Sequence, residues 1–135
     1  MKLRNGLIVS ATALAVLMVL TPPAQAGQYL VSGSGGTGFK TPAEALKLLQ
    51  KMVIPTFVAL RKLKAEGKIL AGGLPVGERA FIFILEASSN EEAGRIIRAL
   101  PLWPILKWKV TPLQSVKGRE RQERPTVEML KKRMK

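Results

Sequence analysis

The chain lacks three residue types on which many enzyme and metal sites depend: its 135 residues include no cysteine, no histidine and no aspartate. Without cysteine, disulfides, thiol nucleophiles and thiolate metal sites are excluded. Without histidine, the usual acid–base group at neutral pH, the commonest metal ligand and every His-based triad are excluded. We therefore expect no metal and no other cofactor, and only glutamate, lysine, arginine and one tyrosine remain for chemistry.

Acidic residues are scarce beside basic ones, at nine Asp and Glu against 22 Lys and Arg, which gives a formal net charge of +13. The imbalance is strong in residues 114–135, where eight Lys and Arg stand against three Glu. Such a surface favours anionic partners, for example lipid headgroups, polysaccharide or acidic metabolites.

The first 26 residues have the pattern of an export signal. Lys2 and Arg4 precede an apolar run over residues 7–20, and Ala24 and Ala26 form a small-x-small cleavage site. A helix of that run reaches about 21 Å, short of the roughly 30 Å hydrocarbon core of a membrane. The sequence predicts cleavage after Ala26 and a periplasmic or secreted protein, for which nucleic acid is not an expected partner.

Residues 27–113 predict one small domain. A strand over residues 28–32 is followed by a helix that begins at Thr41, where Thr-Pro-Ala-Glu forms a capping box. Pro55 interrupts this helix and predicts a bend near residues 52–54. The apolar stripe expected on its buried face consists of Leu46, Leu49, Val53, Phe57, Leu60 and Leu63.

The second half of the domain repeats the alternation of strand and helix. Residues 69–74 predict a short strand, and residues 80–85, apolar at every position, predict a central strand covered on both faces. A second capping box at Ser89 starts another helix, and residues 105–113 form the last strand. The order βαββαβ predicts an α+β, ferredoxin-like sandwich, with a four-stranded antiparallel sheet and two helices on one face.

Residues 114–135 are charged and contain few apolar side chains, so this tail is expected to be largely disordered, with a short helix near its end. In that helix Val127, Leu130 and Met134 would share one side. Two interpretations stay open: the tail binds an anionic membrane surface, or it is a solvated, disordered end.

Two prolines bracket an apolar pair in residues 100–104, which read LPLWP and form what we name the corner loop. This motif, the following VTPL of residues 110–113, and the helix-ending turn at Gly67 and Lys68 resemble the muconolactone Δ-isomerase family. The resemblance implies a ferredoxin-like α+β barrel, dimers or larger rings, and a ligand cleft between the sheet and neighbouring elements. The family reaction moves a proton, and with it a double bond, in an anionic lactone.

The chain departs from that family pattern at two places. Isomerases of the family continue the turn with Trp, Arg and His, whereas residues 69–73 here read ILAGG; acidic residues of the last strand are replaced by Lys107 and Lys109. The family's own reaction is therefore not expected. We predict an exported domain that binds a small organic, anionic ligand, with isomerisation left open. The alternative is a non-catalytic, envelope-associated interaction protein that uses its basic tail.

Four charged residues are candidates for chemistry, each with a plainer alternative. Glu78 and Glu86, at the two ends of a predicted strand, could act as general acid or base, or be solvated strand-end charges. Lys107 and Lys109 share one strand face and could hold a carboxylate, with one amine serving as a base. They could equally protect an edge strand from aggregation.

Two aromatic residues are candidates for ligand contact. Tyr29 faces either the core or the cleft. Trp103 in the corner loop could be a lid over a ligand, or could plug the end of the domain or a subunit contact. Together with the small size of the domain, Trp103 predicts a homodimer or a larger homo-oligomer.

Overall fold

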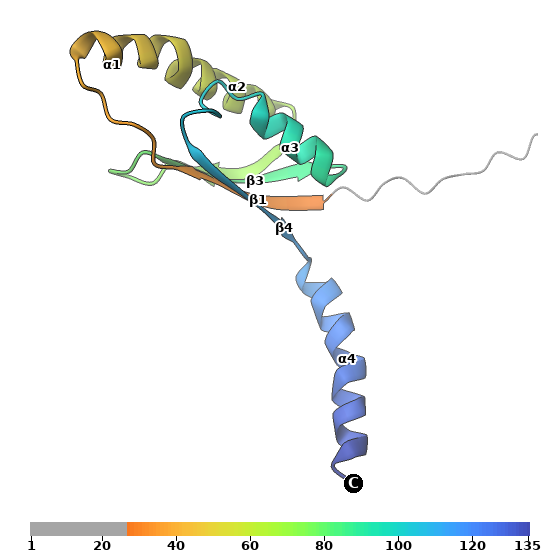
Figure 1. Ribbon diagram of the computed structural model, residues 1–135. Coiled ribbons are helices and arrows are strands. Elements are labelled where there is room, and N and C mark those ends of the chain that lie inside the picture. The colour runs from red at the N-terminus through yellow and green to blue at the C-terminus, as the bar shows by residue number, and fades with distance from the viewer. Residues whose placement is uncertain (1–26) are drawn as a thin grey trace, which may run out of the picture.

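A computed structural model describes residues 27–135, and the predicted export signal lies outside the described residues. Its elements are, in order, β1 (Gly27–Ser34), α1 (Pro42–Leu48), the π-helix η1 (Leu49–Val53), α2 (Ile54–Ala65), β2 (Ile69–Gly73), β3 (Ala80–Ala87), α3 (Asn90–Arg98), β4 (Lys107–Leu113) and α4 (Val116–Arg133). The four strands form one sheet in the order β2-β3-β1-β4, and all pairs are antiparallel. Helices α1, α2 and α3 lie over one face of it (Figure 1), so the predicted ferredoxin-like α+β fold is confirmed.

The register of the central strands sorts their side chains between two faces. Val31 of β1 lies opposite Phe83 of β3, and both are buried beneath the helices, as is Leu85. The neighbouring Ile82 points the other way and is 44% exposed. The prediction that β3 is covered on both faces is therefore wrong. An unbroken apolar run shows that both faces of a strand can be buried. Whether both are buried depends on a second layer of helices or strands, which other parts of the molecule must supply.

A π-turn joins α1 to α2 and replaces the bend predicted before Pro55. The backbone N–H of Ile54 donates to the carbonyl of Leu49, five residues back, which is the π-helical pattern. Pro55 has no N–H to donate, and in an α-helix its ring would press on the carbonyl of Lys51. The wider turn lets the helix pass the proline without breaking.

The π-turn also shifts the buried stripe of the helix by one residue, because it holds one residue more than an α-turn. Leu48 and Met52 face the domain before it, whereas Thr56 and Leu60 do so after it. Leu46 is consequently 57% exposed, and α1 buries no residue. The predicted stripe is thus wrong in its first half, since it assumed an uninterrupted α-helical period.

The largest difference between prediction and structure is in the tail, residues 114–135. Residues expected to be largely disordered form the 18-residue helix α4, which projects away from the sheet (Figure 1) and buries no side chain. Its start is capped by Ser115, whose hydroxyl accepts from the N–H of Gly118 at 3.0 Å. Ion pairs within one helical turn then support it, and these pairs stabilise even isolated helices; they join Arg119 to Glu123, Glu120 to Arg124, and Glu128 to Lys131.

Candidate functional site

A cavity of about 270 Å³ lies beside the corner loop, between the helices and one end of the sheet. We name it the corner cavity. Four segments far apart in the sequence meet there: the loop after β1, the end of α1 with η1, the connection from β2 to β3, and the corner loop with the residues after it. Its apolar walls include Leu49, Val53, Leu74, Phe81, Leu102, Ile105 and Leu106.

Local sequence explains how these walls come together. Leu49 and Val53 are the first and last residues of the π-turn, and both line the cavity. Gly36, with φ at +107°, lets the loop after β1 run close to the end of the corner, because a Cβ there would lie 3.3 Å from Leu106.

The corner loop itself is fixed by a buried hydrogen bond. The N–H of Leu102 donates to the hydroxyl of Thr56 at 3.0 Å, and the Leu102 side chain is buried. Thr56 stands directly after Pro55, so the helical segment that the π-turn re-aligns is the one that holds the corner loop. The corner loop is therefore anchored to α2.

Two of the residues that line the corner cavity are charged, and they are neighbours in the sequence. Glu78 and Arg79, just before β3, are exposed and line it. The Arg79 guanidinium carbon lies 5.0 Å from the centre of the Phe39 ring, a cation–π distance. Phe39 also lines the cavity, so this contact holds a cation at the edge of an apolar space.

The other charged candidates do not join Glu78. Lys107 and Lys109 lie on the uncovered face of β4, an edge strand, where their positions pair with Ser34 and Ser32 of β1. Glu86 is on the uncovered face of β3, opposite Gln28. The four residues therefore form no single constellation, and the corner cavity takes only Glu78 from them.

The aromatic candidates are also placed apart from the cavity walls. Tyr29 is buried in the core, and its hydroxyl donates to Oδ1 of Asn90 at 2.9 Å, which ties β1 to the start of α3. Trp103 is 42% exposed, whereas its neighbour Leu102 is the corner-loop side chain that faces the cavity.

Sequence reasoning missed the pairing of Phe39 with Arg79 and the role of the π-turn. No local signal could reveal the pairing, because 40 residues separate the two positions and only the sheet brings them together. The π-turn had a partial signal in Pro55, which was interpreted as a bend. Trp108 of β4 stacks its ring on Phe81 at 6.0 Å between centroids, and its buried Nε1 has no hydrogen-bond partner among the described residues.

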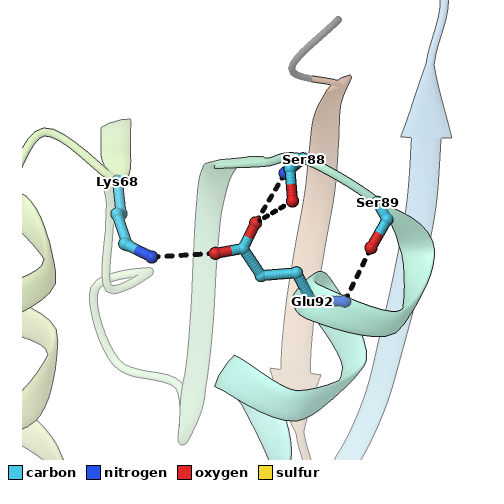
Figure 2. Close-up of polar contacts among 4 residues, drawn as sticks. All are labelled: Lys68, Ser88, Ser89 and Glu92. Atoms are coloured by element: carbon cyan, nitrogen blue, oxygen red, sulfur yellow. Dashed lines mark hydrogen bonds and ion pairs between the residues drawn. The ribbon is translucent and has the colours of Figure 1, made fainter. Parts of the chain in front are cut away.

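A separate polar cluster at the start of α3 is structural (Figure 2). The Glu92 carboxylate accepts from the Ser88 hydroxyl at 2.5 Å, from the Ser88 N–H at 2.7 Å and from the Lys68 ammonium at 3.0 Å. The hydrogen bonds from Ser88, followed by that from Lys68, lower the pKa of Glu92 to about 2. Because both carboxylate oxygens accept hydrogen bonds, Glu92 stabilises the turn before α3, and we do not assign it a role in catalysis.

Two further features bear on function. Within residues 27–135, no three residues of the His, Cys, Asp or Glu types gather as they would around a metal ion. Over the same range, none of the helices combines the length and the apolar character that a bilayer crossing requires.

Comparison with known proteins agrees with the fold. A family model described as muconolactone delta-isomerase matches residues 40–117, which is more than half of the chain. A search of curated protein sequences gives no match. The matched range contains the π-turn, the corner loop, and most of the walls of the corner cavity. The chain belongs to the muconolactone delta-isomerase family.

Proposed function

We propose that the corner cavity binds a small organic acid, whose apolar body fills the cavity and whose carboxylate pairs with Arg79. One observation carries this proposal: Arg79 is stacked on Phe39 at the edge of a cavity walled by aliphatic side chains. Its volume of about 270 Å³ lies just below the usual range of small-molecule sites, about 300–1,000 Å³, so the ligand must be small. An arginine fork matches a carboxylate geometrically, and apolar walls favour a ligand with little other polarity.

Binding can be tested with benzoate and its neutral counterpart, benzyl alcohol, by calorimetric titration of the purified protein. We expect Arg79→Gln to raise the Kd for benzoate about tenfold, the order of one charge-assisted contact, and to leave benzyl alcohol unchanged. Arg95→Gln removes an exposed arginine from α3 and is the matched control. Equal binding of benzoate by the wild type and Arg79→Gln would refute the assignment.

The family description names an isomerase, and we propose Glu78 as the residue that moves the proton. Glu78 is the carboxylate among the residues that line the corner cavity. On a β,γ-unsaturated acid it would take a proton from the carbon next to the ligand carboxylate and return it to the far carbon of the double bond. The double bond moves by one position, and no other reactant is consumed.

This step predicts that the protein converts but-3-enoate into its conjugated isomer, which absorbs in the ultraviolet. Glu78→Gln should abolish the conversion and still bind benzoate at least as tightly as the wild type, because a negative charge has been removed beside the ligand. Conversion at an undiminished rate in Glu78→Gln would exclude Glu78 as the base. No conversion by the wild type would leave the corner cavity as a binding site.

We also propose that the protein is exported and processed after Ala26. The support is sequence pattern alone, an apolar run too short to span a bilayer followed by small residues at positions 24 and 26. Intact-mass measurement of protein from the secreting cell tests it. A mass that includes Met1 to Ala26 would contradict the proposal.

A second candidate function is favoured by α4. Because residues 116–133 are one continuous helix, Val127 and Leu130 lie within one sector of its surface, with Lys131 beside them, and Met134 follows as the C-cap residue. We propose that α4 binds anionic surfaces such as lipid headgroups. This activity needs neither the corner cavity nor its ligand.

A further inference from the structure

A second hollow, outside the corner cavity, lies between α2 and the edge of the sheet. It has a volume of about 370 Å³ and is open to solvent along one side. Phe57 and Leu60 of α2 cover it, and Gly72, Gly73 and Phe83 line it from the sheet. We name it the edge groove. Phe57 and Phe81 both line it, and their ring centroids lie 5.7 Å apart.

The groove is open at the end of β2 because this strand lines it there with glycine, Ile69 being its apolar side chain at the other end. Gly72 pairs with Phe83 and has φ at +142°, and a Cβ at this position would lie 2.5 Å from the Phe83 Cα. Only glycine allows β2 to approach β3 so closely. Gly72 is thus a position on the helix-covered face that carries no side chain, whereas the next residue, Gly73, is in register with Ile82 on the opposite face.

Two cations stand over this apolar space. Arg61 and Lys64 are three residues apart on α2, line the groove and are exposed. Neither forms an ion pair with a described acidic residue, in contrast to Lys62, whose ammonium lies 3.9 Å from the Glu66 carboxylate. Arg61 and Lys64, which line the groove, are therefore cations without an acidic partner among the described residues. Lys62, which does not line it, has one in Glu66.

We propose that the edge groove binds a single-chain amphiphile with a carboxylate head, its alkyl chain lying between α2 and Gly72 and its head between Arg61 and Lys64. Apart from these two cations the lining residues are apolar or glycine, so an alkyl chain with one anionic head matches them. A neutral chain would leave the two cations without a partner. The site is distinct from the corner cavity, since Leu74 and Phe81 stand between the two and Arg79 belongs to the other.

The first test uses chain length and head group in calorimetric titrations. Each buried methylene strengthens binding about fourfold, so octanoate should bind at least tenfold more tightly than butyrate. Octanoate should also bind more tightly than 1-octanol. Affinity that is independent of chain length, or equal for octanoate and 1-octanol, would overturn the proposal.

The second test uses charge reversal on one helix. Arg61→Glu with Lys64→Glu should raise the Kd for octanoate about tenfold, because two exposed ion pairs are lost and repulsion replaces them. Lys62→Glu, an exposed lysine of the same helix, is the matched control and should change the Kd less than about twofold. A loss in Lys62→Glu as large as in the double variant would show a general charge effect and refute the site.

The third test locates the chain in the unaltered protein. A spin-labelled octanoate should broaden the amide resonances of Gly72 and Gly73 and spare those of Gly35 and Gly36, which line the corner cavity. The reverse pattern would place octanoate in the corner cavity and overturn the second site. Benzoate binding that depends on Arg79 is measured separately, so the two proposals fail independently.

Discussion

Thr56 and Leu102 are joined by a hydrogen bond inside the domain, the Leu102 N–H donating to the Thr56 hydroxyl at 3.0 Å. They lie 46 positions apart, Thr56 is fully buried, and the bond links the helix after the π-turn to the corner loop. The corner cavity lies between these two elements. Its shape therefore depends on one hydroxyl that no motif or charge pattern in the sequence marks.

Replacing Thr56 with valine, which has nearly the same shape, should lower the free energy of unfolding by about 1–3 kcal/mol, because the Leu102 N–H is left buried without an acceptor. Thr56→Ser keeps the hydroxyl and should recover the hydrogen bond, losing only a methyl group. Urea denaturation followed by circular dichroism measures both. Loss of stability in Thr56→Ser without loss in Thr56→Val would mean that packing by the methyl group, and not the hydrogen bond, holds the corner loop.

The free energy of unfolding should decrease at acidic pH because Glu92 becomes protonated there. Its pKa is lowered from 4.5 to about 2 in the folded protein, so its contribution is complete above about pH 4.5 and is lost as the pH falls from there towards 2. Glu92→Gln should therefore flatten the stability profile over that window. Glu91→Gln, which removes the neighbouring exposed carboxylate of the same helix turn, is the control. A profile of Glu92→Gln as steep as that of the wild type would assign the acid sensitivity elsewhere.

Capping patterns show what the sequence predicts well. Thr41 and Ser89 both accept from the N–H three residues on, at 3.2 and 3.1 Å, as a capping box requires. The glutamates of both boxes, however, reach one residue further back than expected, to the N–H of Lys40 and of Ser88. Starts of helices are predictable because their hydrogen bonds are local, whereas the return contact depends on the course of the preceding chain.

Several of the wrong predictions share a physical cause: each concerns a contact between segments that are far apart in the sequence. The exposure of Ile82 depends on whether a second layer covers the sheet, and the contact of Arg79 with Phe39 depends on how two loops meet. The π-turn changes the register of the helix by one residue, so a stripe drawn with the α-helical period fails at Leu46 and Leu49, which are exposed, and agrees with the structure at Leu60 and Leu63, which pack against the core. Of the candidate site, sequence could offer Glu78 but not the walls around it.

We propose that the uncovered sheet face pairs with a second copy of the chain. Leu30, Ile82 and Leu113 lie on it and are 37%, 44% and 40% exposed, and a small domain gains stability by covering such a surface. Ile82→Lys should shift light scattering at tens of micromolar from dimer to monomer. Val58→Lys, on the exposed side of α2, is the control. A wild-type monomer at that concentration would reject the pairing.

Binding of anionic membranes should require α4 and weaken with salt. Each Lys or Arg near an anionic bilayer contributes about 1 kcal/mol, and a helix that lines up Val127, Leu130 and Met134 can insert these side chains shallowly. Screening at 0.15 M shortens the reach of the charges to about 8 Å, so the attraction falls as ionic strength rises. Vesicles with phosphatidylserine should therefore sediment the protein at low salt and release most of it at high salt, and uncharged vesicles should not bind it.

Two variants identify the part of the chain responsible. A protein ending at Ser115 lacks α4, which buries no residue, and should lose sedimentation while keeping the unfolding transition of the domain. Leu130→Ser with Met134→Ser leaves every charge in place and should weaken binding if the apolar side chains insert. Were the shortened protein to sediment as well as the full chain, the positive charge of the folded domain, and not the helix, would be the membrane contact.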